Sequence, residues 1–172
     1  QFSSDVYGAL CPGRPVEAGR IARTLGHLNG YAVGTDGAVF MATMISLAFH
    51  EHDPHRIVLE AARSLHPGSP YRQCLDLVIS MAEAGRSFEE ISKAIEDRWH
   101  IEYQATNNAV PNGGLVAASV WFDGGDFLKT VHLAAAAAGL TEADGNAAAD
   151  DAWIGTRGGR RTIQQNQDTQ TV

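Results

Sequence analysis

One stretch of this sequence has no polar face, and it limits the folds that the chain can adopt. Residues 38–50 read AVFMATMISLAFH and are apolar on every side of a helix. A surface helix keeps a polar face, whereas a helix enclosed by other elements has none. The stretch is also shorter than the roughly 20 apolar residues that a bilayer-spanning helix requires. We therefore predict that residues 38–50 form the central helix of a globular core.

Helix start signals recur along the rest of the chain. Pro15 stands at a typical first helical position, and the Asp-Pro pair at 53–54 and the Ser-Pro pair at 69–70 each combine an N-cap residue with a proline. Ser87 and Glu90 form a capping-box pattern. The apolar residues that follow repeat at helical intervals. The predicted helices, besides 38–50, lie within residues 13–25, 54–65, 70–84, 87–99, 115–122 and 126–138.

Two segments rich in glycine and asparagine separate these helices. They cover residues 26–37 and 102–114. Because glycine tolerates positive φ, we predict that both are loops and that the first contains positive-φ positions. No segment alternates apolar and polar residues with the period of a strand. The sequence thus predicts one all-α domain over residues 1–155, ending in a loop that leads into a last helix, and a disordered polar tail at 156–172.

The composition argues against several classes of function. The formal net charge is −7 and the sequence pI is about 5.4, so the chain has no net basic character with which to bind nucleic acid. Its start lacks the regions of a signal peptide, and no apolar run is long enough to span a membrane. Cys11 and Cys74 do not form a metal or disulfide pattern. We expect a cytoplasmic protein with reduced cysteines and neither a nucleic-acid nor a membrane partner.

Oxygen-bearing side chains gather near the end of the chain, in the sequence TEADGNAA. Glu142, Asp144 and Asn146 alternate along a loop that leads into a helix, so their oxygens can converge on one cation. Such hard oxygen ligands suit Mg²⁺ or Mn²⁺. The simpler interpretation is that Asp144 caps the following helix, where the helix dipole favours its charge. The local sequence leaves both interpretations open.

A single histidine lies in the first glycine-rich segment, LGHLNGYAVGTDG. Its ring can donate a hydrogen bond to a phosphate or a ribose, and the surrounding loop amides can bind an anion. The alternative is that the histidine only caps the preceding helix. The candidate substrate-binding residues are His27, Asn29, Gly30, Tyr31 and Gly34.

Four further histidines lie close together in the sequence, with two carboxylates among them. The group comprises His50, His52, His55, His66, Glu51 and Asp53. Its spacing matches no HExxH or similar zinc pattern, and histidines near helix ends are favoured by the dipole in any case. We therefore favour a structural role over a zinc site. The motifs of nucleophile elbows, P-loops and Rossmann glycine turns are absent from the sequence.

Five stretches follow one another in an order found in a known family. They are SSDVYGALCPGRPVEAGRIAR, the His27 segment, GAVFMATMISLAF, VPNGGLVAASVWFDGGDFLKTVHLAAAAAGL and EADGNAA. Together they resemble the bacterial ADP-ribosylglycohydrolase family, which also includes the J-type crystallins and the hydrolase that reactivates dinitrogenase reductase. The resemblance runs from about Ser3 to Gly155 and corresponds to the C-terminal half of the family's domain.

This resemblance implies an orthogonal all-α bundle with a pair of Mg²⁺ or Mn²⁺ ions between its helices. The implied reaction is hydrolysis of an N- or O-glycosidic bond to ADP-ribose or a related nucleotide sugar, on an ADP-ribosylated protein or a small ADP-ribose conjugate. Glu142 and Asp144 would be metal ligands, with Asn146 as a third candidate, and His27 with its glycines would hold the substrate. The family's Thr-Asp-Asp metal run and its general base belong to an N-terminal half, which we expect as a partner of this chain.

The last of these stretches departs from the family's Asp-Thr-Asp pattern. Glu142 stands in place of the first aspartate, Ala143 in place of the threonine, and Gly145 where an oxygen ligand often follows the second aspartate. The extra methylene of glutamate moves the carboxylate by roughly 1 Å or more, which the strict geometry of magnesium tolerates poorly. The alternative function is therefore that of a catalytically inactive, crystallin-like structural or ligand-binding relative.

Overall fold

The chain folds into a series of helices joined by short connections. The computed structural model describes residues 1, 3–28, 30–100 and 108–139, and no strand occurs in these ranges. The prediction of an all-α chain is thereby confirmed. The α-helices are α1 (Asp5–Ala9), α2 (Pro15–Leu25), α3 (Val33–Ala48), α4 (Pro54–Arg63), α5 (Pro70–Glu83), α6 (Phe88–Ile95), α8 (Ala109–Asp123) and α9 (Phe127–Gly139). Two short turns, η1 (Gly26–Leu28) and η2 (Glu96–His100), continue α2 and α6.

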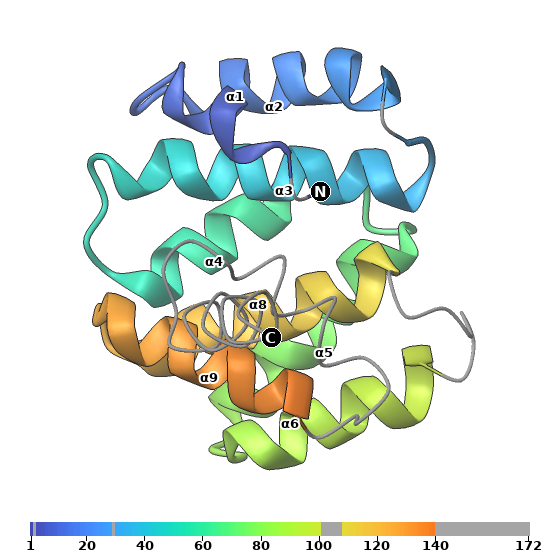
Figure 1. Cartoon of the computed structure of the whole chain (residues 1–172), viewed down its shortest axis with the longest axis vertical. Coiled ribbons are helices and arrows are strands. Elements are labelled where there is room, and N and C mark those ends of the chain that lie inside the picture. Colours follow the sequence, from blue (N-terminus) through green and yellow to red (C-terminus); the bar gives the residue numbers. More distant parts are fainter. Residues whose placement is uncertain (2, 29, 101–107, 140–172) are drawn as a thin grey trace, which may run out of the picture.

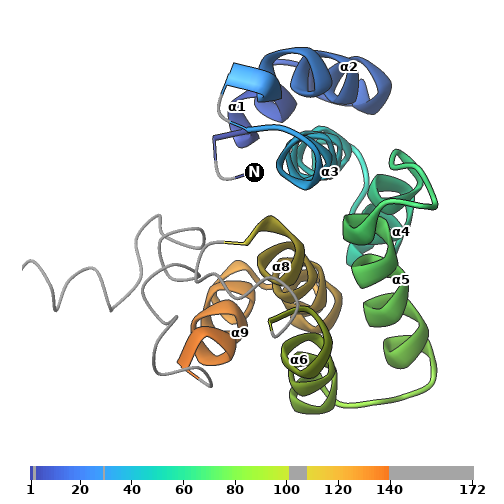
Figure 2. The same ribbon diagram turned by 90° about the vertical axis from the view of Figure 1, so that its right-hand side faces the viewer.

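The helix α3 is enclosed by other helices. It contacts α1 and α2 on one side and α4, α5 and α8 on the other (Figures 1 and 2). Its buried residues lie on most of its circumference and are Thr35, Gly37, Ala38, Val39, Phe40, Ala42, Thr43, Met44 and Ser46. Met41 and Ile45, on the remaining side, are half-buried. The prediction of a central apolar helix at 38–50 is therefore confirmed, although α3 begins at Val33 and ends at Ala48.

The helix α8 is the centre of the second half of the structure. It contacts α4, α5, α6 and α9 as well as α3 (Figure 1). Ala117 and Ala118 are fully buried, and such small residues allow neighbouring helices to approach closely. Among the described residues, no helix combines the length and apolar character needed to cross a membrane.

Most of the predicted helix ends are confirmed. The side chains of Asp53 and Ser69 accept hydrogen bonds of 3.0 and 3.2 Å from the backbone N–H groups two residues further on. Ser87 and Glu90 form the reciprocal capping box. Gly85 follows the end of α5 with φ of +75°. These ends depend on residues only a few positions apart, which is why the sequence reveals them.

The two glycine-rich segments contain more helix than predicted. The prediction of a loop over 26–37 is wrong from Val33 onward, where α3 begins, and that of a loop over 102–114 is wrong from Ala109 onward, where α8 begins. The prediction of positive φ in the first segment is confirmed at one described position, which is not a glycine. Its positive φ, of 52°, belongs to Ala32.

Close packing around one aromatic ring explains two of these glycines. A Cβ atom on Gly37 of α3 would lie 2.9 Å from Cε2 of Tyr71, and one on Gly113 of α8 would lie 2.0 Å from the Tyr71 hydroxyl oxygen. Tyr71 lies in the first turn of α5 and is completely buried. Glycine therefore serves close helix contact here, rather than a turn.

A buried hydroxyl on α3 holds the connection between α1 and α2. Ser46 Oγ accepts a 3.0 Å hydrogen bond from the backbone N–H of Arg14 and donates to the carbonyl of Cys11. The N–H of Gly13 donates to the Ser46 carbonyl at 2.9 Å. The short helix α1 was not expected from the sequence, because one turn carries no apolar repeat.

Both cysteines are buried free thiols. Burial raises the pKa of the Cys74 thiol to about 12. At neutral pH this thiol is therefore protonated, and it packs as a small apolar group.

The substitution Gly113→Ala should lower the free energy of unfolding by about 2–3 kcal/mol or prevent folding, because the new methyl group overlaps the buried Tyr71 ring. Gly34→Ala is the matched control, since a Cβ there has no other atom within 4 Å and alanine favours helix. Urea denaturation followed by circular dichroism measures both. Equal stability of the two variants would contradict the packing of α8 on α5.

Candidate functional site

The candidate residue His27 lies on η1, directly after α2. Gly26 precedes it, and a Cβ atom on Gly26 would lie 3.1 Å from the Cβ of Ala38. The glycine therefore lets the end of α2 lie against α3. His27 itself is exposed, so its ring can meet a ligand.

Ala32 is the N-cap residue of α3, and no side chain caps this end of the helix. The backbone conformation of Ala32 begins the helix instead. Its φ of 52° and ψ of −121° resemble the first central residue of a type II′ turn, a position that favours glycine. Its carbonyl accepts hydrogen bonds from the N–H groups of Thr35 and Asp36, at 3.0 and 3.1 Å. A non-glycine residue in such a conformation is strained, and strain of this kind concentrates at functional sites.

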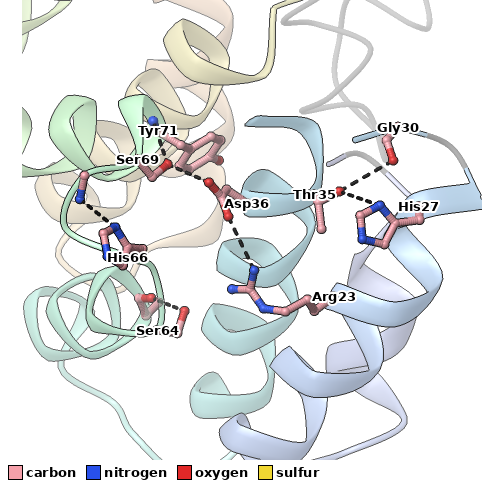
Figure 3. Close-up of polar contacts among 11 residues, drawn as sticks. Arg23, His27, Gly30, Thr35, Asp36, Ser64, His66, Ser69 and Tyr71 are labelled. Carbon is pink, nitrogen blue, oxygen red and sulfur yellow. Dashed lines mark hydrogen bonds and ion pairs between the residues drawn. The ribbon is translucent and has the colours of Figure 1, made fainter. Parts of the chain in front are cut away.

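Thr35 connects this helix start to His27. Its side chain is buried, and its hydroxyl oxygen lies 3.5 Å from His27 Nδ1 and 3.5 Å from the carbonyl oxygen of Gly30 (Figure 3). The three residues come from η1, the following turn and the first part of α3. One hydroxyl thus contacts both the candidate histidine and one of the candidate glycines.

Asp36 forms a second polar contact, on the other side of α3. It accepts a 2.6 Å hydrogen bond from the Ser69 hydroxyl and lies 3.7 Å from the guanidinium of Arg23 (Figure 3). Ser69 also caps α5 by accepting from the Tyr71 N–H. This network holds α2, α3 and the start of α5 together. The sequence predicts Ser69 only as a cap, because its partner Asp36 lies far away along the chain.

A small cavity adjoins the glycines of this segment. Its volume is about 30 Å³, and its lining residues are Gln1, Ser3, Ser4, Gly26, Gly30, Gly34 and Ala38. The start of the chain therefore lies against the His27 segment. The cavity is far smaller than the several hundred Å³ of a typical ligand pocket, so by itself it is too small to hold a nucleotide.

The structure brings together part of the predicted site. His27 and Gly30 share the Thr35 hydroxyl, Gly34 lines the small cavity, and Tyr31 is 80% exposed beside them. Asn29 lies outside the described residues. The predicted metal ligands Glu142, Asp144 and Asn146 also lie outside them.

His55 and His66, two of the other histidines, each have local contacts of their own. The His55 ring stacks on Trp121 with 4.4 Å between ring centroids, and its Nε2 lies 3.0 Å from the Trp121 carbonyl. His66 Nδ1 accepts a hydrogen bond from the Gly68 N–H at 3.0 Å. Within residues 1, 3–28, 30–100 and 108–139, no three His, Cys, Asp or Glu side chains are placed to hold a metal ion.

A larger groove lies at the opposite end of α2. Its volume is about 250 Å³, and it is mostly apolar. The lining residues are Pro15, Val16, Thr43, Leu47, Glu60, Arg63 and Ser64. No residue from the His27 segment reaches it, so the groove and the candidate site are separate features.

Comparisons with protein-family models, curated proteins and solved structures find no match for this chain. The family resemblance therefore depends on the five stretches of sequence alone.

Ala32→Gly should raise the free energy of unfolding by about 1 kcal/mol, because it relieves the strained φ at a cost of only about 0.4–1 kcal/mol in chain entropy. Ala48→Gly is the matched control, since Ala48 is exposed in the regular last turn of α3 and its replacement should lower stability. Thermal and urea unfolding compare the two. A loss of stability in both would mean that Ala32 does not adopt the positive φ.

Proposed function

We propose that this chain is the C-terminal part of a cytoplasmic, metal-dependent glycohydrolase of the ADP-ribosylglycohydrolase type. It would cleave an N- or O-glycosidic bond to ADP-ribose, in an ADP-ribosylated protein or a small conjugate. The N-terminal half of the same domain would complete the active site, and the whole would form the family's orthogonal bundle. The five collinear stretches suggest this function, and the contact between the first stretch and the His27 segment at the amino end of α3 supports it.

One observation carries the proposal: segments of the resembling stretches that are distant in sequence meet at the amino end of α3. Ser3 and Ser4, from the first stretch, line one cavity with Gly30 and Gly34. Gly113, from the VPNGG stretch, lies against Tyr71. The Tyr71 hydroxyl also donates a 3.0 Å hydrogen bond to Gln1. A shared site is a physical reason for these separate stretches to occur together.

Exposed apolar side chains beside His27 are consistent with an incomplete site. Leu28 is 78% exposed and Tyr31 is 80% exposed. Exposed apolar side chains near a candidate site offer apolar surface that a ligand or another part of the protein can cover. In the proposed enzyme, the adenine ring or the N-terminal half would cover them.

The chemistry of the proposed reaction divides between metal ligands and substrate-binding groups. Asp144 and Glu142, with Asn146, offer oxygen ligands of the kind that Mg²⁺ or Mn²⁺ prefers. When bound, the pair of ions would orient the ribose hydroxyls and activate a water for attack on the anomeric carbon. His27 and the surrounding backbone would orient the substrate.

A structural or ligand-binding relative without catalysis is the second candidate. Three departures in one motif favour it: Glu142 for aspartate, Ala143 for threonine and Gly145 in place of an oxygen ligand. Each removes or displaces an oxygen that the ion requires. Metal-dependent turnover separates the two candidates.

In the complete protein, Asp144→Ala should lower the rate of ADP-ribose release at least about 100-fold, because removing a charged ligand weakens the metal site. The assay follows free ADP-ribose from a modified protein or a small conjugate with Mg²⁺ or Mn²⁺, and again with a chelator. Asp97→Ala is the control, since Asp97 is an exposed carboxylate on η2, paired with Lys93.

Wild-type activity that the chelator and Asp144→Ala both abolish supports the enzyme. Activity that survives both would reject the metal mechanism. Absence of release under every condition would favour the structural relative.

A further inference from the structure

The contact between Thr35 and His27 determines which kind of ligand atom His27 can bind. Thr35 is 4% exposed and lies in the first part of α3. Its Oγ1 is 3.5 Å from both His27 Nδ1 and the Gly30 carbonyl oxygen (Figure 3). These distances are at the long end for hydrogen bonds.

The number of protons on Thr35 and His27 limits the hydrogen bonds that this arrangement can form. The hydroxyl of Thr35 has one proton, and the Gly30 carbonyl can only accept. When the Thr35 hydroxyl donates its proton to the Gly30 carbonyl, its oxygen has only lone pairs left to face His27. Nδ1 of His27 must then carry a proton and donate it to the Thr35 oxygen. A neutral His27 then has no proton on Nε2.

No other described residue is hydrogen-bonded to Nε2 of His27, and the side chain is exposed. An unprotonated imidazole nitrogen accepts a hydrogen bond from a hydroxyl, but it repels an unprotonated phosphate oxygen. A ribose offers hydroxyl donors, whereas a diphosphate at neutral pH offers only acceptors.

We propose that Thr35 is a positioning residue that holds His27 with its proton on Nδ1, so that Nε2 accepts a hydrogen bond from a hydroxyl of the distal ribose of ADP-ribose. The choice of ribose rests on the proposed function, but the choice of a hydroxyl over a phosphate does not. The opposite arrangement, in which Thr35 donates to Nδ1, would leave Nε2–H as a donor for a phosphate.

The chain offers a matched control on the same helix. Thr43 is 3% exposed, and its hydroxyl oxygen has no hydrogen-bond partner among the described residues. Thr43→Val and Thr35→Val therefore make the same chemical change at similar burial. Only Thr35→Val removes a group in contact with His27. Thr35→Ser keeps the hydroxyl and should restore the wild-type behaviour.

The first experiment is ¹⁵N NMR of the chain with labelled histidine, at about pH 8.5, where histidine side chains in general are neutral. His27, assigned by its loss in a His27→Gln variant, should carry its proton on Nδ1 in wild type, Thr35→Ser and Thr43→Val. Thr35→Val should shift the population toward Nε2–H. A wild-type His27 protonated on Nε2, or a tautomer unchanged in Thr35→Val, would overturn the proposal.

The second experiment compares the binding of ADP-ribose and ADP, which lacks the distal ribose. Thr35→Val should weaken ADP-ribose binding about tenfold, the usual effect of losing one hydrogen bond, and change ADP binding little. Equal weakening of both would overturn the ribose contact. If the tautomer is as proposed but neither compound binds wild type, the proposed function fails and the positioning role of Thr35 stands.

Discussion

Because α3 is enclosed by other helices, each polar group on it must find a partner inside the protein or remain unsatisfied. Ser46 binds the connection between α1 and α2, Asp36 binds Ser69 at the start of α5, and Thr35 contacts His27 and Gly30. The hydroxyl of Thr43 is the exception among the buried side chains described. The polar residues of this central helix therefore determine how α2, η1 and α5 are oriented around it.

The candidate site is a consequence of this arrangement. Gly26 lets η1 lie against α3, while Gly37 and Gly113 let α3 and α8 close around Tyr71. The amino end of α3 thus becomes the place where the start of the chain, the His27 segment and the start of α8 meet (Figure 2). The ring of His27 is exposed, and its Nδ1 faces the buried hydroxyl of Thr35. Its Nε2 is therefore the nitrogen that can bind a ligand.

The sequence predicted the features that depend on nearby residues. Asp53, Ser69 and Ser87 cap their helices, and the apolar stretch at 38–50 is enclosed as far as Leu47. The sequence-based prediction of loops failed at the glycine-rich segments, because glycine occurs both in turns and at close helix contacts. Only the distant partner Tyr71 distinguishes these two uses of glycine. The sequence identified His27 as a candidate because it lies among glycines. Its contact with Thr35 depends on the fold, so the sequence did not reveal it. Glycine composition alone would not place the positive φ at Ala32.

The most direct test of the account is a titration of the ¹⁵N-labelled chain with ADP-ribose, with and without Mg²⁺, followed by the backbone amide signals. The account predicts that the largest changes occur at His27, Gly30 and Thr35, around the amino end of α3, even if binding is weak. Changes concentrated instead in the apolar groove at the other end of α2, or no changes at millimolar ADP-ribose, would contradict the claim that the end of α3 is a substrate site.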